Sequence, residues 1–373
     1  MKQISKTVAV VGIQGLPAKY GGFETMVENI IGENCTDGVE YTVFGSGKDM
    51  VDTRDLKEYK NAKLRYVDSF TANGAQSILY DIVSLLKCIG KRYDVVLVLG
   101  VSGCIFLPVF RLFYRGKLIV NIDGLEHRRA KWGKFAKWFL KLSEKCAVKV
   151  ADVIVSDNAA IQDYVTETYG KHSEMIAYGG DQALREVDEE RQKEILDKFG
   201  LEKGRYAFAV CRIEPENNCH VTLEAFAGME KDENPLLKKL MFVGNWSRSA
   251  YGHKMMAMYE KYNNILIHTP IYDLDTLYVL RSNAGVYVHG HSAGGTNPSL
   301  VEAMQFPVPV VAYDCVYNRE TTHNKAMYFK DADSLAEHLH DEQNYSAIGL
   351  AMQEIAKKEY LWGVIAKKYE SLY

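Results

Sequence analysis

Runs of apolar, often β-branched residues alternate along the whole chain with longer stretches of helical spacing. In the first half these runs lie at residues 7–13, 39–44, 63–67, 94–100, 117–123 and 151–157. In the second half they lie at residues 205–213, 239–245, 264–270, 284–290 and 307–313. Strands that are apolar along their whole length are typical of parallel sheets buried on both faces. The pattern therefore predicts an α/β fold with two doubly wound domains in series.

The alternation weakens at residues 179–204, where the sequence is strongly charged. We therefore expect an N-terminal domain over 1–180, a linker and helix over 181–204, a C-terminal domain over 205–345 and a final helix over 346–373. Ligands of such sheets bind at the carboxyl ends of the strands, so two domains facing each other would share one cleft.

Composition narrows the choice of partners and compartment. The chain has 373 residues and a net charge of -3, so no overall field favours nucleic acid, and we expect none as a partner. Seven cysteines without a CxxC pair indicate reduced thiols in the cytoplasm. The N-terminus shows no cleavable signal pattern, and the uncharged stretch 95–110 is too short and too interrupted to span a membrane.

The first glycine-rich loop, GIQGLPAKYGGFETMVENI at 12–30, follows the first predicted strand. It contains neither G-x-G-x-x-G nor a G-K-[ST] phosphate loop, so a nucleotide site is not expected there. Gly21 and Gly22 stand immediately before a predicted helix start, whose unpaired amides would point to the cleft. A tight turn with packing glycines is the alternative.

A sharper pattern, HGHSAGGTNPSLVEAM, lies at 289–304. Asn297 followed by Pro298 is typical of a helix N-cap, and free amides at Gly294, Gly295 and the helix start would suit a phosphate. Glu302 is then one turn inside the helix, where its carboxylate could accept hydrogen bonds from a ribose hydroxyl. The alternative is a plain capped helix.

The segment CRIEPENN at 211–218 follows the first strand of the second half and puts Arg212 at that strand's end. A guanidinium there could neutralise a diphosphate through paired hydrogen bonds, with Glu214 and Glu216 holding the arginine or contacting the ligand. An interdomain salt bridge is the alternative.

In the first half, Asp123 and Glu126 stand just past a predicted strand end, where a general acid or base would lie; solvated loop carboxylates are the alternative. Basic residues over 128–149 interleave with four aromatic ones, Trp132, Phe135, Trp138 and Phe139. This composition indicates a helix that binds an anionic membrane surface. The alternative is an ordinary amphipathic helix, of similar composition, whose aromatic side chains face the core.

A histidine pair, His289 and His291, could suggest zinc. Two histidines without a third ligand at a suitable spacing make a poor metal site, so we expect no metal.

Taken together, KYGGFE, DGLE, CRIEPENN and HSAGGTNPSLVEAM resemble glycosyltransferase family 4, and more narrowly its bacterial capsule and cell-wall rhamnosyltransferases. The resemblance spans most of the chain. It implies a GT-B fold of two Rossmann-like domains around a central cleft, with a C-terminal helix crossing back to the first domain. It also implies transfer with retention of configuration.

The resemblance also implies roles for single residues. The catalytic candidates are Arg212 on the diphosphate, with Asp123 and Glu126. The donor-binding candidates are Glu214, Asn217, Gly294, Gly295, Thr296, Asn297, Ser299 and Glu302, the last on the ribose. The acceptor-binding candidates are Tyr20, Gly21, Gly22 and Glu24.

Two positions depart from the family pattern. The first glutamate of the usual pair is replaced by Gly294, which removes a side chain that touches the donor sugar. The lysine that accompanies the arginine is replaced at about Asn217. Backbone amides over 294–297 and Arg212 would then have to stabilise the departing diphosphate.

The expected reaction is transfer of L-rhamnose from dTDP-L-rhamnose, without a metal, to a lipid-diphosphate-linked saccharide. The protein would work on bacterial surface polysaccharide at the inner face of the cell membrane. Three alternatives stay open: another nucleotide hexose donor, a nucleotide-sugar epimerase of the same architecture, and a non-catalytic sugar- or partner-binding protein.

Overall fold

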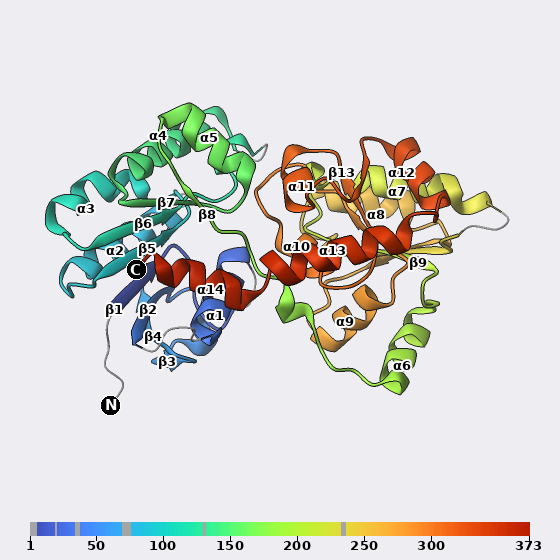
Figure 1. Cartoon of the computed structure of the whole chain (residues 1–373), viewed down its shortest axis with the longest axis horizontal. Helices are drawn as coiled ribbons and strands as arrows, with labels where there is room; N and C mark the ends of the chain where they lie inside the picture. Colours follow the sequence, from blue (N-terminus) through green and yellow to red (C-terminus); the bar gives the residue numbers. More distant parts are fainter. Residues whose placement is uncertain (1–5, 19–20, 34–37, 69–75, 130–131, 233–235) are drawn as a thin grey trace. The chain divides into compact units, whose positions relative to one another are not determined.

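The computed structural model describes the chain except residues 1–5, 19–20, 34–37, 69–75, 130–131 and 233–235 (Figure 1). Two compact units make up the chain. The first contains residues 1–178 and 362–373, and the second contains residues 179–361. Each has its own sheet and its own core.

The sheet of the first unit has the strand order β3-β4-β2-β1-β5-β6-β7-β8. All neighbours pair in parallel except β3 and β4, which are antiparallel. The strands are β1 (Lys6–Val11), β2 (Val39–Ser46), β3 (Glu58–Tyr59), β4 (Ala62–Val67), β5 (Val95–Leu99), β6 (Lys117–Asn121), β7 (Val153–Ser156) and β8 (Glu174–Met175).

Helices cover both faces of this sheet. They are α1 (Gly22–Glu33), α2 (Gln76–Ile89), α3 (Leu107–Phe113), α4 (Lys134–Val150), α5 (Ala159–Tyr169) and α14 (Trp362–Ser371). Figure 1 shows α4 and α5 on one side of the sheet and α1 and α14 on the other. Central strands are therefore apolar on both faces: every residue of β5 is buried.

The second unit has a six-stranded parallel sheet in the order β11-β10-β9-β12-β13-β14. Its strands are β9 (Tyr206–Val210), β10 (Lys239–Val243), β11 (Ile265–His268), β12 (Val286–His289), β13 (Val310–Tyr313) and β14 (Met327–Phe329). Its helices are α6 (Glu189–Phe199), α7 (Cys219–Gly228), α8 (Ala250–Tyr259), α9 (Leu274–Ser282), α10 (Pro298–Ala303), α11 (Val316–Thr321), α12 (Ala332–His340) and α13 (Tyr345–Glu359). The predicted doubly wound α/β organisation is confirmed in both units.

The segment expected as a linker and helix, 181–204, belongs to the compact second unit. It contains a short 3-10 helix at Asp181–Ala183 and the helix α6, whose Ile195 and Leu196 are buried against the unit. Its high charge reflects one exposed helix face rather than an unstructured connection.

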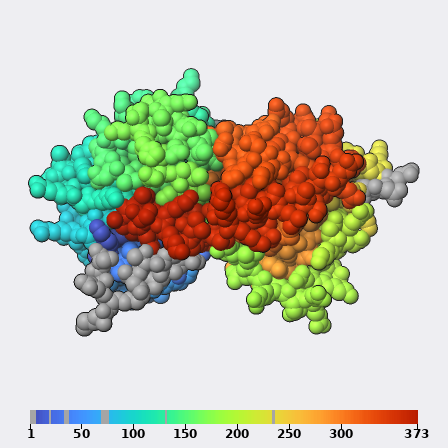
Figure 2. Space-filling view, viewed as in Figure 1, coloured from blue at the N-terminus to red at the C-terminus, as the bar shows by residue number. Residues whose placement is uncertain are grey.

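The single helix expected over 346–373 is two helices, α13 and α14, with a break at residues 360–361. The break has a tertiary cause. The carbonyl of Tyr360 accepts from the Gly180 amide at 2.9 Å and from Gln305 Nε2 at 3.0 Å, while its hydroxyl donates to Thr321 O at 2.8 Å. These bonds fix Tyr360 outside helical geometry. In Figure 2, α13 lies on the surface of the second unit and α14 on that of the first.

Candidate functional site

Two loops at the carboxyl ends of neighbouring strands form the centre of the candidate site. One follows β9 and covers residues 211–218; the other follows β12 and covers residues 290–297. They are tied together because Ser292 donates to Glu216 O from both its amide (3.0 Å) and its hydroxyl (2.8 Å). Asn218 Nδ2 also donates to Gly290 O at 2.9 Å. The two motifs that the sequence singled out separately are therefore one structural feature.

The loop after β12 has the predicted start of α10, with Asn297 at the N-cap and Pro298 in the first turn. The Asn297 side chain makes no capping hydrogen bond. Gly294, Gly295 and Thr296 are buried, and Ser299 is half-buried in the first turn. Since α10 has only six residues, its dipole is weak, and the amides of the loop itself are the stronger candidates for binding an anion.

Gly294 explains the missing glutamate in physical terms. Its φ of +116° lies in a region that L side chains rarely adopt, although a Cβ there would meet only Asn297 Nδ2, at 3.9 Å. Backbone conformation therefore excludes a side chain at this position, whereas space does not.

Arg212 and Asn217 lie on the other loop with different roles. The Arg212 side chain is half-buried, and its guanidinium makes no hydrogen bond or ion pair with any residue that the structure describes. Asn217 is buried and donates from Nδ2 to Arg212 O at 2.6 Å. The Asn217 side chain therefore stabilises the loop through this hydrogen bond, and its expected role in donor binding stays a prediction. The Arg212 guanidinium stays available for an anion. The Glu214 side chain is half-buried beside them.

Glu302 lies in α10, as predicted, with contacts that the sequence did not reveal. Arg281 Nη2, from the last turn of α9, forms an ion pair with its Oε2, and Gln182 Nε2 donates to its Oε1 at 2.7 Å. Arg281 is 8% exposed and Glu302 19% exposed. No motif marks Arg281 or Gln182, because the three residues come from elements far apart in sequence.

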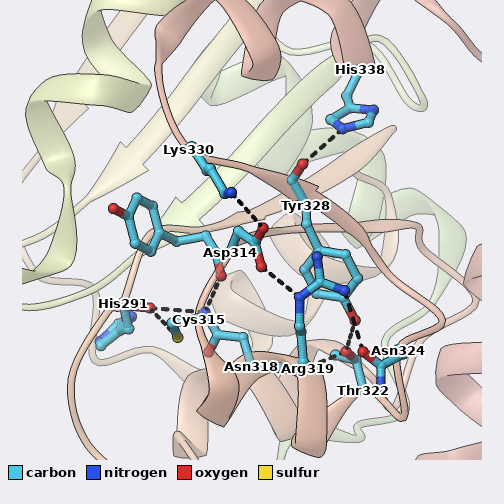
Figure 3. Close-up of polar contacts among 11 residues, drawn as sticks. His291, Asp314, Cys315, Asn318, Arg319, Thr322, Asn324, Tyr328, Lys330 and His338 are labelled. Carbon is cyan, nitrogen blue, oxygen red and sulfur yellow. Dashed lines mark hydrogen bonds and ion pairs between the residues drawn. The ribbon is translucent and has the colours of Figure 1, made fainter.

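A polar network supports the loop after β12 from the side of β13 (Figure 3). Asn318 Nδ2 donates to the carbonyls of His291 and Tyr313, both at 2.8 Å. Asp314 pairs with Arg319 at 2.5 Å and with Lys330 at 3.6 Å, and it thereby fixes the start of α11. The hydrogen bond from Asn318 holds the His291 carbonyl, and with it the start of the loop.

The histidine pair is buried and stacked. The rings of His289 and His291 lie 4.4 Å apart at an angle of 13°. Burial lowers the pKa of His289 well below its usual range, and His291 adds to this effect. Among the described residues no three histidines, cysteines or carboxylates gather in a way that could hold a metal.

In the first unit, Gly21 and Glu24 form one compact arrangement. A Cβ at Gly21, whose φ is +125°, would lie 2.0 Å from Glu24 Oε2, so glycine makes room for this carboxylate. Glu24 Oε1 accepts from the Gln14 amide at 2.7 Å. Burial raises the pKa of Glu24 despite that hydrogen bond, and the charge of Asp123 raises it further. Gly22 begins α1, whereas Tyr20 lies outside the described residues.

The two carboxylates after β6, Asp123 and Glu126, have different surroundings. Asp123 is half-buried in a left-handed conformation (φ 57°), with its amide on Asn121 Oδ1 at 3.0 Å. Glu126 pairs with Arg129 Nε at 2.7 Å and accepts from Trp132 Nε1 at 2.9 Å. These contacts tie Glu126 to the basic segment that follows.

The basic aromatic segment 128–149 has both buried and exposed parts. The Glu144 side chain is fully buried and accepts from Tyr164 (2.7 Å), Tyr169 (2.6 Å) and Lys141 (3.0 Å). Phe135 and Trp138, in contrast, are 76% and 60% exposed. The helix is thus anchored through its C-terminal half, while aromatic side chains near its start face solvent. Residue 131 lies outside the described part.

Comparisons with known proteins match each unit separately. Residues 5–181 match a domain of unknown function, DUF1972, and residues 191–344 match the glycosyl transferases group 1. Among curated proteins, none matches the chain.

Three solved structures illustrate the likeness in fold. HepE of Anabaena in complex with UDP is 14% identical over 98% of each chain, with a TM-score of 0.76. Sucrose-phosphate synthase of Thermosynechococcus elongatus is 15% identical over 99% of this chain and 98% of that one, with a TM-score of 0.79. A putative UDP-N-acetylglucosamine 2-epimerase of Listeria monocytogenes is 13% identical over 99% of this chain and 95% of that one, with a TM-score of 0.61.

At these identities the structures establish the fold, two Rossmann-like domains of the GT-B type, which confirms the predicted fold class. The chain therefore has the GT-B fold, and residues 191–344 of its second unit match the glycosyl transferases group 1.

Proposed function

We propose that this protein is a retaining glycosyltransferase that takes its sugar from a nucleotide-sugar donor bound to the second unit. The observation that carries the proposal is the pairing of the loops at 211–218 and 290–297, which brings an unpaired guanidinium, loop amides and a fixed carboxylate into one unit. The structural relative HepE was solved with UDP and with UDP-glucose.

The donor would bind through complementary charges. Arg212 and the amides over 294–297 would contact the diphosphate, and Glu302 would accept hydrogen bonds from the sugar of the nucleoside. By resemblance the donor is dTDP-L-rhamnose, and the acceptor is a lipid-diphosphate-linked saccharide of bacterial surface polysaccharide. Another nucleotide hexose is the alternative donor.

Transfer with retention would proceed on one face of the sugar. The bond from C1 to the diphosphate oxygen breaks, and the acceptor oxygen forms its bond to C1 on the same face. The acceptor proton passes to the departing phosphate oxygen, whose charge Arg212 and the loop amides stabilise. The positive φ of Gly294 disfavours any side chain there, so the scheme uses no nucleophilic carboxylate at this position. No residue in it requires a metal.

The acceptor would bind to the first unit near Asp123, Glu24 and the glycines 21 and 22. The two carboxyl groups of this region are Glu24, whose pKa is raised by burial and further by the charge of Asp123, and the half-buried Asp123 itself, which follows β6. Such a pair suits hydrogen bonding to saccharide hydroxyls.

Membrane association of the first unit is the remaining part of the proposal. The helices α3 and α4 pack against each other and expose five large apolar side chains. These are Val109, Leu112, Phe113, Phe135 and Trp138. The only acidic residue of the two helices is Glu144, which is buried, whereas Lys134, Lys145 and Lys149 are exposed.

A surface that is apolar and cationic fits an anionic bilayer, and two copies of it would repel each other. No helix within the described ranges is both long enough and apolar enough to cross a membrane. We therefore propose peripheral attachment to the cytoplasmic face of the cell membrane.

The proposed reaction is tested with a donor panel that includes dTDP-L-rhamnose and UDP-hexoses, incubated with membrane lipid-linked acceptors. Nucleotide release and glycolipid mass are followed together. Transfer from any donor, abolished by Arg212→Ala, supports the transferase. No transfer from any donor contradicts it.

The alternative reaction is epimerisation, for which the likeness to the Listeria protein in fold is the relevant observation. Donor incubated without acceptor distinguishes the two. An epimerised donor sugar in that sample would replace the transferase proposal, and unchanged donor would support it.

Membrane attachment is tested by sedimentation with phosphatidylcholine vesicles that contain or lack phosphatidylglycerol. Charge reversal at Lys134, Lys145 and Lys149, and separately Leu112→Ser with Phe113→Ser, should each weaken binding to the anionic vesicles. Leu350→Ser, at an exposed leucine of the second unit, is the control. Equal binding by all variants would contradict the assignment of this surface.

A further inference from the structure

The Glu302 carboxylate is held by two partners from separate elements of the second unit. Arg281 reaches it from the last turn of α9, and Gln182 reaches it from the 3-10 helix Asp181–Ala183. The 3-10 helix packs against both α9 and α10. Each carboxylate oxygen therefore has one protein donor, so the group can neither rotate freely nor swing toward solvent.

We propose that Arg281 and Gln182 are positioning residues that fix Glu302 as the acceptor for a hydroxyl of the donor's ribose or deoxyribose. The inference rests on the proposed donor site and names the residues that make it selective. A carboxylate has about four lone-pair positions, two on each oxygen. The two protein donors occupy one on each oxygen, which leaves one open position on each for ligand hydroxyls.

Burial explains why this arrangement needs Arg281. The Glu302 side chain is only 19% exposed, and an ionised carboxylate at that depth is costly unless it is paired. A guanidinium has five donors in a rigid fork, so it can form an ion pair with the carboxylate and fix its orientation at the same time.

A direct contact between Arg281 and the diphosphate is less consistent with the structure than this positioning role. Its side chain is 8% exposed and its Nη2 is committed to Glu302. The Arg212 guanidinium, in contrast, makes no hydrogen bond or ion pair with the described residues. The two arginines therefore have different roles in donor binding. Arg212 contacts the phosphates, whereas Arg281 acts on the nucleoside sugar through Glu302.

Gln182 adds a connection to the polypeptide that leaves the first unit. It stands four residues after Tyr178, the last residue of the first unit's N-terminal part. The Gly180 amide donates to Tyr360 O at 2.9 Å, so the first and last segments of the second unit meet beside α10. A Cβ at Gly180 would lie 2.3 Å from Val301 O, which shows how closely this segment approaches the helix that carries Glu302.

The test compares nucleotides that differ by one hydroxyl. Binding of dTDP and 2′,3′-dideoxythymidine diphosphate, and of UDP and 3′-deoxy-UDP, is measured by calorimetry on the full-length protein. Wild type should bind the nucleotide that carries the 3′-hydroxyl about tenfold or more tightly, the value of one hydrogen bond to a charged group. Arg281→Gln and Glu302→Gln should each reduce this preference to about twofold or less.

A double-mutant cycle separates positioning from independent contacts. The Arg281→Gln, Glu302→Gln double variant should lose no more discrimination than either single variant, because both act through the same carboxylate. Arg281→Lys should restore part of the preference, since it keeps the charge without the fork. Arg191→Gln, which breaks an exposed arginine–glutamate pair in the same unit, is the matched control and should leave the preference unchanged.

The outcomes distinguish this inference from the proposed function. If wild type binds none of these nucleoside diphosphates, the donor site itself is wrong. If wild type binds and discriminates, and Arg281→Gln discriminates equally well while folded by circular dichroism, the positioning role is refuted. Gln182→Ala, which leaves the ion pair intact, should show an intermediate preference, and a full wild-type preference would remove Gln182 from the assignment.

Discussion

Asp81 in α2 provides a quantitative test of the first unit. Its side chain is 4% exposed, and it pairs with no cation in the part of the chain that the structure describes. Burial raises the pKa of this carboxyl to about 7, although the Ser102 hydroxyl and the Gly103 amide favour the ionised form. The perturbation is Asp81→Asn, which removes the titration and keeps a carbonyl acceptor in place.

The direction of the pKa shift of Asp81 determines how the free energy of unfolding changes with pH. A folded-state pKa above the unfolded value of 3.8 means that the folded protein binds the proton more tightly. The stabilising contribution is therefore complete below pH 3.8 and is lost as the pH rises toward 7. A shift of about 3 units corresponds to roughly 4 kcal/mol, of which roughly 2 to 3 kcal/mol is lost between pH 5 and 8.

The assay measures the free energy of unfolding of wild type and Asp81→Asn in urea at several pH values from 5 to 8. The difference between the two proteins should move in favour of the variant by roughly 2 to 3 kcal/mol across this range, because all other titrations cancel. Asp163→Asn, at an exposed aspartate of the same unit, is the control and should run parallel to wild type. A constant difference between Asp81→Asn and wild type would refute the reasoning.

Three further predictions concern the site and its support. Arg212→Ala should reduce kcat about 10²- to 10³-fold in the transferase assay, and unchanged kcat would remove Arg212 from the reaction. Gly294→Glu should not provide a working carboxylate, because the positive φ at this position costs a side chain roughly 1 to 3 kcal/mol. We expect the variant to bind nucleotide more weakly and to have a lower thermal stability. Higher transferase activity would contradict this prediction. Burial alone would raise the pKa of Glu144, but hydrogen bonds from His127, Tyr169 and Tyr164 and the charge of Lys141 together lower it to about 2. Glu144 therefore contributes stability that is present above pH 4.5 and lost as the pH falls toward 2, roughly 3 kcal/mol in all, and Glu144→Gln should flatten this part of the acid-unfolding curve.

The sequence was sufficient to predict the fold and the two loops that carry the candidate site. Apolar strands in alternation with helices specify parallel sheets, and parallel sheets bring loop after loop to one edge. The adjacency of CRIEPENN and HSAGGTNP follows once β9 and β12 are neighbours. The helix start at Asn297 and Pro298 was predictable because capping is a local property.

The contacts between these side chains could not be predicted from the sequence. Arg281, Gln182 and Glu302 meet only because three elements pack in three dimensions, and no spacing encodes that contact. Asn217 occupies the position of an expected ligand but turns inward to the backbone of its own loop. Glu126 has the position expected of a catalytic carboxylate, yet it forms an ion pair with neighbouring Arg129. Local patterns give position along the chain, and orientation depends on the neighbours.

The discontinuity of the first unit has a consequence for how the protein is made. Residues 362–373 supply α14, which packs on α1 and places the buried Tyr369 hydroxyl within 2.8 Å of Asn121 Nδ2. On a ribosome, these residues follow the whole second unit, a delay on the order of 10 to 40 s at usual bacterial and eukaryotic elongation rates. The second unit can therefore complete its core while the first still waits for its last helix. Chaperone demand should accordingly fall on the nascent first unit, and a stalled chain that ends before residue 362 should be a preferred substrate for proteolysis.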